Sequence, residues 1–221
     1  MSLQGKKYTG LFAIPVIVAA LGYFVDIYDL LLFGIIRQPS LASLGLTPEQ
    51  VDSQGLFIMN VQMIGLLIGG IISGVIGDKK GRLSVLFGSI LVYSLANIAN
   101  GMVQTVGQYA LCRFVAGLGL AGELGAGITL VSEILPKEKR GIATSMVAGI
   151  GLSGAVVAFI LKELFAWRTC YFIGGGLGFL LLLLRISVFE SGMYQQVKQT
   201  DVQRGNFFML FRIKIFFNKF G

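Results

Sequence analysis

Four ionisable residues lie inside long apolar segments, where they could bind protons or pair with one another. Asp26 and Asp29 fall in one segment, and Arg113 and Glu123 fall in another. A charge at the centre of a lipid bilayer costs about 2.5–3.5 kcal/mol on insertion scales, so each residue needs an opposite charge or a water-filled cavity. Because the chain has no histidine, carboxylates are the candidates for proton binding.

Depth along the two segments pairs two of these residues. If the first segment crosses a bilayer outward and the other inward, Asp29 and Arg113 both lie roughly 10 Å from the outer surface, at 1.5 Å per helical residue. We therefore expect an Asp29–Arg113 ion pair. Glu123 lies roughly 15 Å further inward and is expected in a different site. Asn60 and Gln62 in the second segment and Asn97 and Asn100 in the third add uncharged polarity, either lining a cavity or bonding between helices.

Two interpretations of the Asp29–Arg113 pair stay open. It could be a permanent salt bridge that only fixes helix packing. Alternatively, Asp29 could be a protonatable carboxylate whose pairing with Arg113 changes when substrate or a proton binds. Asp26 shares a helix face with Asp29, three residues away, and Glu123 is a second candidate for proton binding.

The segments that carry these residues are long enough to cross a bilayer. Of 221 residues, 55% are hydrophobic and 13% are charged, about half the usual charged share of a soluble domain. Mean hydropathy is +0.79. These values exclude a soluble globular protein and a disordered chain. We expect six membrane-spanning helices, each near the roughly 20 residues that a bilayer requires: 11–36, 55–77, 83–103, 107–132, 141–161 and 168–189.

The basic residues predict how the helices are oriented. With a cytoplasmic N-terminus, 14 of the 18 basic residues fall on the cytoplasmic side, Arg185 at the end of the sixth segment among them. Arg37, Lys162 and Arg168 fall on the opposite side. Both termini are therefore predicted to be cytoplasmic. The net charge of +7 reflects this orientation in a lipid bilayer, so no nucleic-acid partner is expected. The predicted location is a bacterial inner membrane.

Small residues at four-residue spacing predict close contact between helices. Gly117, Ala121 and Gly125 share one helix face, and Gly70 and Gly74 share another. Such faces let membrane helices approach within van der Waals contact. The sequence offers no metal-ligand cluster and no activated nucleophile, so no enzyme activity, metal or cofactor is expected.

The connection between the second and third segments carries a motif. Gly74-Val-Ile-Gly-Asp78-Lys-Lys-Gly81-Arg82 resembles the GxxxDxxGR loop of the major facilitator superfamily. Physically, Asp78 could cap the next helix and accept a hydrogen bond from Arg82, and Gly81 could permit a tight turn. In that family the loop latches one state of the transporter.

Further matches follow in family order. Arg113 to Gly119 resembles the fourth-helix RxxxGxG element, which the family associates with proton coupling. Glu133 and Arg140 fit the E-x-x-P-x-x-x-R-G loop between helices four and five. Tyr28-Asp29 is similar to the first helix of the sugar-porter and metabolite–proton symporter branches. Gly192 and Met193 replace the Pro-Arg of sugar porters, which leaves organic acids and osmolytes open beside sugars.

The resemblance implies an all-α membrane protein of six transmembrane helices in two three-helix inverted repeats, equivalent to the N-terminal half of a transporter. Residues 1–194 would form the bundle, and residues 195–221 a cytoplasmic tail with a short basic-aromatic interfacial segment. The implied activity is proton-coupled symport of a small metabolite. Asp26, Asp29, Arg113 and Glu123 would serve coupling, and the inner gate would comprise Gly74, Asp78, Gly81, Arg82, Glu133 and Arg140.

Other readings remain for half a transporter. The chain could be a truncated fragment that transports nothing, or one subunit that pairs with a separately encoded half or with a second copy of itself. A six-span channel is a further class, although the sequence has no repeated pore signature.

Overall fold

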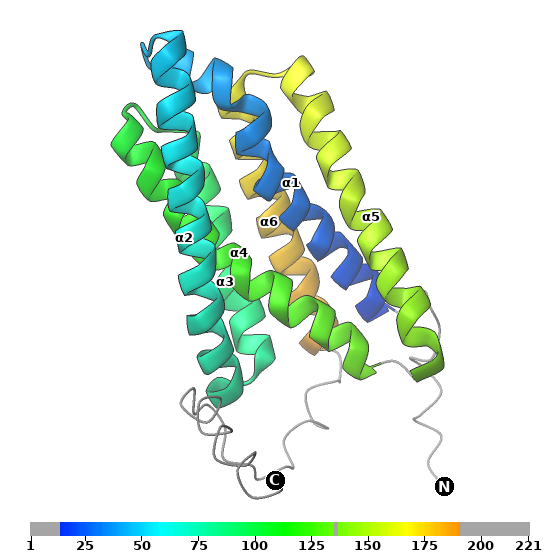
Figure 1. The fold of residues 1–221 in the computed structure, drawn as a ribbon. Helices are drawn as coiled ribbons and strands as arrows, with labels where there is room; N and C mark the ends of the chain where they lie inside the picture. Colours follow the sequence, from blue (N-terminus) through cyan, green and yellow to red (C-terminus); the bar gives the residue numbers. More distant parts are fainter. Residues whose placement is uncertain (1–13, 135–136, 191–221) are drawn as a thin grey trace, which may run out of the picture.

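The computed structural model describes residues 14–134 and 137–190, and these residues form an all-helical bundle (Figure 1). Consecutive helices run in opposite directions and are joined by short connections. The six helices in chain order are α1 (Ile14–Ser43), α2 (Pro48–Lys80), α3 (Arg82–Asn100), α4 (Val106–Ile134), α5 (Lys137–Leu164) and α6 (Trp167–Glu190). Each overlaps one predicted apolar segment.

Except for α3, the helices are longer than the predicted apolar segments because local signals place their ends. Pro39 was expected in the first gap but lies inside α1, which continues to Ser43. Pro48 was also expected in that gap, yet it opens α2 as the first helical residue, where proline loses no helical hydrogen bond. The side chain of Gln50 accepts a hydrogen bond from the Thr47 amide at 3.1 Å, which satisfies one free donor at this helix start.

Among the described residues, four helices are long and apolar enough to cross a membrane, with spans at Val16–Ser43, Pro48–Lys79, Gly141–Leu164 and Trp167–Ser187. The apolar part of α3 is shorter, at Ser84–Asn100. The described residues include no strand. The predicted all-α architecture is therefore confirmed, while six membrane crossings and an inverted repeat stay predictions.

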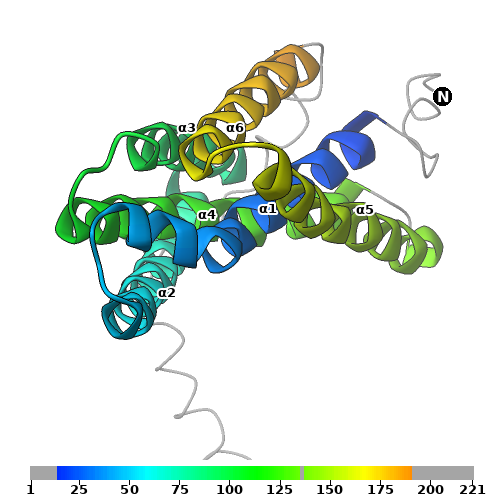
Figure 2. The ribbon, with the colours of Figure 1, turned by 90° about the horizontal axis from the view of Figure 1, so that it is seen from above.

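Helices α1 and α4 lie at the centre of the bundle (Figure 2). Helix α4 packs on α2 and α3, α1 packs on α5 and α6, and α3 also packs on α6. Large apolar side chains are exposed on the outer helices, such as Leu67 on α2 at 67% and Leu152 on α5 at 60%. Outward apolar surface on a bundle with a polar interior is typical of helices in lipid.

Glycines bring α2 and α4 into backbone contact, but not all the predicted ones do. A Cβ at Gly117 would lie 3.0 Å from the Leu66 amide nitrogen, as expected for a packing glycine. The prediction for Gly70 and Gly74 was wrong, because a Cβ at either meets nothing within 4 Å. Gly65 and Gly69 form the packing face instead, against the backbone of α4. On α2, the four-residue spacing of packing glycines was predicted correctly, but the helix face that carries them was not.

Candidate functional site

The predicted Asp29–Arg113 ion pair is present at the centre of the bundle. Nη1 of Arg113 on α4 lies 3.0 Å from Oδ1 of Asp29 on α1. The side chains are 0% and 1% exposed. A charge-assisted contact at this distance, away from solvent, holds the two central helices together more strongly than a surface pair would.

The rest of the Arg113 guanidinium is held by neutral acceptors on three helices. Nε donates to Oε1 of Gln62 on α2 at 3.2 Å, and Nη1 also donates to Oδ1 of Asn97 on α3 at 3.3 Å. Nη2 donates to the backbone carbonyl of Asp29 at 3.1 Å. Gln62 and Asn97 therefore bond between helices, one of the two roles predicted for the four amides. If Asp29 were neutralised, Arg113 would keep these three acceptors. Asn60 is exposed, and the buried Asn100 amide has no hydrogen-bonding partner among the described residues.

A second buried ion pair joins Glu123 on α4 to Arg185 on α6. Nη1 of Arg185 donates to Oε2 of Glu123 at 2.8 Å, and Nη2 contacts Oε1. Both side chains are buried, at 3% exposure for Arg185 and 1% for Glu123. Arg185, which was expected after the sixth segment on the cytoplasmic side, is instead buried inside the bundle as part of this pair. Its side of the membrane stays a prediction. Glu123 does lie in a separate site from Asp29, as predicted.

Arg185 was missed because hydropathy reports where an apolar segment ends but not which face a residue occupies. It lies near the end of the sixth segment, where arginine usually marks the cytoplasmic surface. Counted from the inner ends of their predicted segments, Glu123 and Arg185 differ by about five residues, or roughly 8 Å. Depth matching would thus not pair them. The available signal was that Glu123 otherwise had no cationic partner.

Asp26 lies between the two ion pairs. It is 2% exposed, and its Oδ1 has no hydrogen-bonding partner among the described residues. Glu123, Arg185 and Asp29 lie within electrostatic range of it. The structure therefore brings all four predicted interior residues into one buried polar tract through α1 and α4, and adds Arg185 to them.

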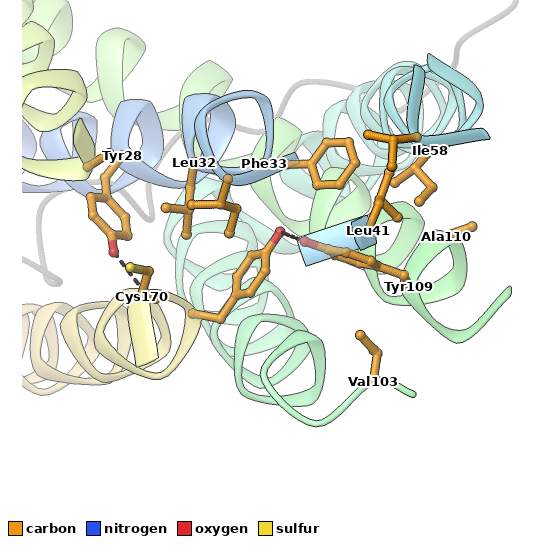
Figure 3. Packing of buried hydrophobic residues seen from close by; sticks show 13 residues of the cluster. Tyr28, Leu32, Phe33, Leu41, Ile58, Val103, Tyr109, Ala110 and Cys170 are labelled. Atoms are coloured by element: carbon orange, nitrogen blue, oxygen red, sulfur yellow. Dashed lines mark hydrogen bonds between the residues drawn. The ribbon is translucent and has the colours of Figure 1, made fainter. Parts of the chain in front are cut away.

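An aromatic cluster packs near the α3–α4 and α5–α6 connections, and Figure 3 shows Tyr28, Phe33 and Tyr109 among its buried residues. The hydroxyls of Tyr109 and Tyr171 lie 2.8 Å apart, and the Tyr28 hydroxyl donates to the Cys170 carbonyl at 2.8 Å. Cζ of Arg113 lies 5.6 Å from the centre of the Tyr171 ring. These rings exclude water from one side of the Arg113 site.

The opposite end of the bundle carries the predicted gate motif. Gly81 has φ +92°, so the tight turn expected there is present. The prediction that Asp78 caps α3 was wrong. Helix α2 continues through Lys80, so Asp78 lies in the last turn of α2. The residue before α3 is Gly81, which provides no side-chain cap. Gly74 is exposed on α2.

Three predicted gate residues cannot be placed as side chains. Glu133 falls in α4, Arg140 in α5 and Arg82 at the start of α3, but their side chains lie outside the described part of the structure, as does that of Gly125. The predicted tail, residues 195–221, is outside it too. No group of three or more metal-ligating side chains occurs among the residues described.

Comparison with known proteins assigns the family. Residues 17–217 match the Major Facilitator Superfamily, so the chain belongs to that superfamily. The sialic acid transporter NanX of Escherichia coli is 32% identical over 198 residues, which cover 88% of this chain and 47% of that protein. The benzoate transport protein of Acinetobacter baylyi is 31% identical over 195 residues, covering 84% of this chain and 41% of its relative.

The fold agrees with this assignment. The proton:xylose symporter XylE, bound to 6-bromo-6-deoxy-D-glucose, superposes with a TM-score of 0.70 at 18% identity, covering 79% of this chain and 44% of that one. The chain thus spans about half the length of the curated relatives it matches. It is a member of a family of membrane transporters, which are not enzymes.

Proposed function

We propose that this chain forms the N-terminal half of a secondary active transporter that couples import of a small metabolite to proton entry. The observation that carries the proposal is the Asp29–Arg113 ion pair, fully buried between the two central helices of a transporter bundle. Ionisable residues within membrane helices face the bundle interior and mark proton or substrate pathways.

In this proposal Asp29 binds the transported proton and Arg113 is its counter-ion. Protonation makes the Asp29 carboxyl neutral while Arg113 keeps its charge, which weakens the contact and frees the guanidinium to shift between its other acceptors, Gln62 and Asn97. A change of partners at the α1–α4 contact would bias how the two central helices pack, and thereby which side of the membrane the transporter faces. A permanent structural salt bridge is the competing interpretation.

The packing pattern supports an inverted repeat. Exchanging α1 with α4, α2 with α5 and α3 with α6 converts the α2–α4 contact into α5–α1, and α3–α4 into α6–α1. All of these helix pairs are in contact in the bundle. Exchanged helices run in opposite directions, as expected for inverted repeats (Figure 1). This supports six crossings, and the distribution of basic residues supports placing both termini at the cytoplasmic side of an inner membrane.

The substrate we propose is a small organic acid, with sugars and osmolytes as the other candidates. The names of similar proteins refer to sialic acid, niacin and benzoate. A transporter of an organic anion can use a proton to neutralise the charge that it carries inward. At the basic end, Gly74, Asp78, Gly81, Arg82, Glu133 and Arg140 would form the gate that closes during the cycle.

The test joins residues 1–194 to the C-terminal half of the Acinetobacter benzoate transport protein. In membrane vesicles with an acidic exterior, we expect labelled benzoate to enter at an initial rate above that of vesicles without the chimera, where benzoic acid crosses the lipid by diffusion alone, and a protonophore to abolish this excess. Asp29→Asn should abolish the excess uptake but retain chimera-dependent exchange of internal for external benzoate, since neutralisation removes coupling and not binding. Asp52→Asn is the matched control, because Asp52 lies on the surface with 68% of its side chain exposed.

If the Asp29→Asn chimera still took up benzoate to the same extent and in a proton-dependent way, the proposed role of Asp29 in proton coupling would be refuted. The 221-residue chain reconstituted alone separates the remaining alternatives. Accumulation by the chain alone, together with a dimer in the membrane, would favour a self-assembling half. Accumulation only when a second half is supplied would favour a subunit of a two-part transporter, and a chain inactive in both forms would be a fragment.

A further inference from the structure

The buried charges of the bundle do not balance. Five acidic or basic residues are buried among those described: three have carboxyl groups, Asp26, Asp29 and Glu123, and two have guanidiniums, Arg113 and Arg185. Arginine stays protonated in proteins, so the interior carries one surplus negative charge unless a carboxyl group binds a proton. An uncompensated buried charge is costly, and such groups neutralise instead.

The two ion pairs leave Asp26 as the surplus group. Asp29 contacts Arg113 at 3.0 Å, and both carboxylate oxygens of Glu123 contact Arg185. Oδ1 of Asp26 has no hydrogen-bonding partner within the described part of the chain. The titratable and charged groups that face Asp26 are Glu123 of α4, Arg185 of α6, Asp29 of its own helix, and Tyr93 of α3, whose hydroxyl is also buried without a partner.

Gly22 shows that Asp26 lies close to the second ion pair. A Cβ on Gly22 would lie 2.6 Å from Oε1 of Glu123 and would contact Nη2 of Arg185. Gly22 is one helical turn before Asp26, and helical side chains lean toward the turn that precedes them. The carboxyl of Asp26 therefore leans toward the space that Glu123 and Arg185 occupy, which glycine leaves open.

We propose that Asp26, Glu123 and Arg185 form a second proton-binding site, in which two carboxyl groups share one guanidinium. Because Arg185 pairs with Glu123, the proton is held by Asp26. Arg185 is thus a positioning residue: by pairing with Glu123 it determines which carboxyl is protonated. The site deepens the proposed function, on which its part in transport rests, by adding a proton site separate from the Asp29–Arg113 pair.

The test measures protonated carboxyl groups directly and needs no transport. The purified 221-residue chain in lipid nanodiscs is examined by infrared spectroscopy at pH 7, and the carbonyl stretch of protonated carboxyl groups is identified by its shift in D2O. We expect a band in the wild type and its loss in Asp26→Asn. The band should also disappear in Glu123→Gln, because Arg185 is then free to pair with Asp26, which releases its proton.

Arg185→Gln should double the band, since both carboxyls then lose their cation. Asp52→Asn, on the surface, should leave it unchanged. Because Asp26→Asn and Glu123→Gln each leave two buried carboxylates with two guanidiniums, both should retain wild-type helicity and elution volume. A wild type without the band would overturn the site, and a band that survives Glu123→Gln would overturn the sharing of Arg185. Neither result would affect the outcome of the benzoate uptake test. Conversely, a chimera that does not take up benzoate would leave the predicted infrared bands unchanged, so the two proposals can fail separately.

Discussion

Two neighbouring glycines on α2 should respond to the same substitution with opposite signs. Alanine in place of an interior helical glycine gains about 1 kcal/mol of helix propensity. At Gly70 the new Cβ meets nothing within 4 Å, so Gly70→Ala should keep this gain. At Gly69 the Cβ would lie 2.7 Å from the Cα and 2.9 Å from the carbonyl carbon of Leu118. Carbon atoms pack best at about 3.5–4.0 Å, so α2 and α4 must separate by roughly 1 Å.

Because the atoms opposite Gly69 are backbone, no side-chain rotation relieves the overlap. Overpacking of this kind costs about 1–3 kcal/mol, and occasionally more. The helix-propensity gain is common to both variants, so the difference between them isolates the packing cost. We expect Gly69→Ala to be less stable than Gly70→Ala by about 3 kcal/mol, the upper part of that range.

The assay is reversible unfolding in mixed detergent micelles, followed by far-ultraviolet circular dichroism and by the fluorescence of Trp167, the single tryptophan. In a chain of this size 1 kcal/mol corresponds to about 2–4 °C in Tm, so the two variants should be well separated in a thermal scan. Equal stability of the two variants, or a less stable Gly70→Ala, would refute the assignment of Gly69 to the α2–α4 contact.

Two further substitutions test the connections between helices. Gly81→Ala should cost about 1–3 kcal/mol, because Gly81 has φ +92° and ψ 149°, a region that other residues avoid; Gly77→Ala, within the preceding helix, is the control and should lose nothing in the same unfolding assay. Arg168→Gln should cost about 1–3 kcal/mol and speed amide exchange at the start of α4, because Nη1 donates to two carbonyls before that helix at 3.0 and 2.8 Å. Arg37→Gln, which loses a part-exposed pair, should cost at most about 1 kcal/mol, and equal effects at both arginines would contradict this account.

The sequence predicted the parts of the site that depend on position along one helix. Apolar segment length located each of the six helices to within several residues, because the pattern is local and a bilayer sets the length. Rise per residue then matched the depths of Asp29 and Arg113, and their atoms are in contact at 3.0 Å. Depth is a one-dimensional quantity, so spacing along the chain is enough to compare it.

The errors have two causes. The first is the position of a helix end: Asp78 was expected to cap α3, but nothing before Gly81 interrupts α2, so helical hydrogen bonding continues past Asp78. The second is the rotation of a helix. Gly70 and Gly74 have the right spacing for packing, yet the helix turns Gly65 and Gly69 toward α4. Rotation of a helix about its own axis depends on all its neighbours, and the uniformly apolar faces of a membrane helix do not encode it.

The sequence by itself determined that this is a membrane protein of apolar helices, that its protonatable groups are carboxylates, and that Asp29 and Arg113 lie at one level. Only the tertiary structure decided which face of each helix is buried. As a result, Arg185 is buried in an ion pair with Glu123, and Oδ1 of Asp26 has no hydrogen-bonding partner among the described residues. The physical reason is that the partner of a buried charge is fixed by lateral contacts between helices far apart in the chain, whereas composition and spacing report only on each helix alone.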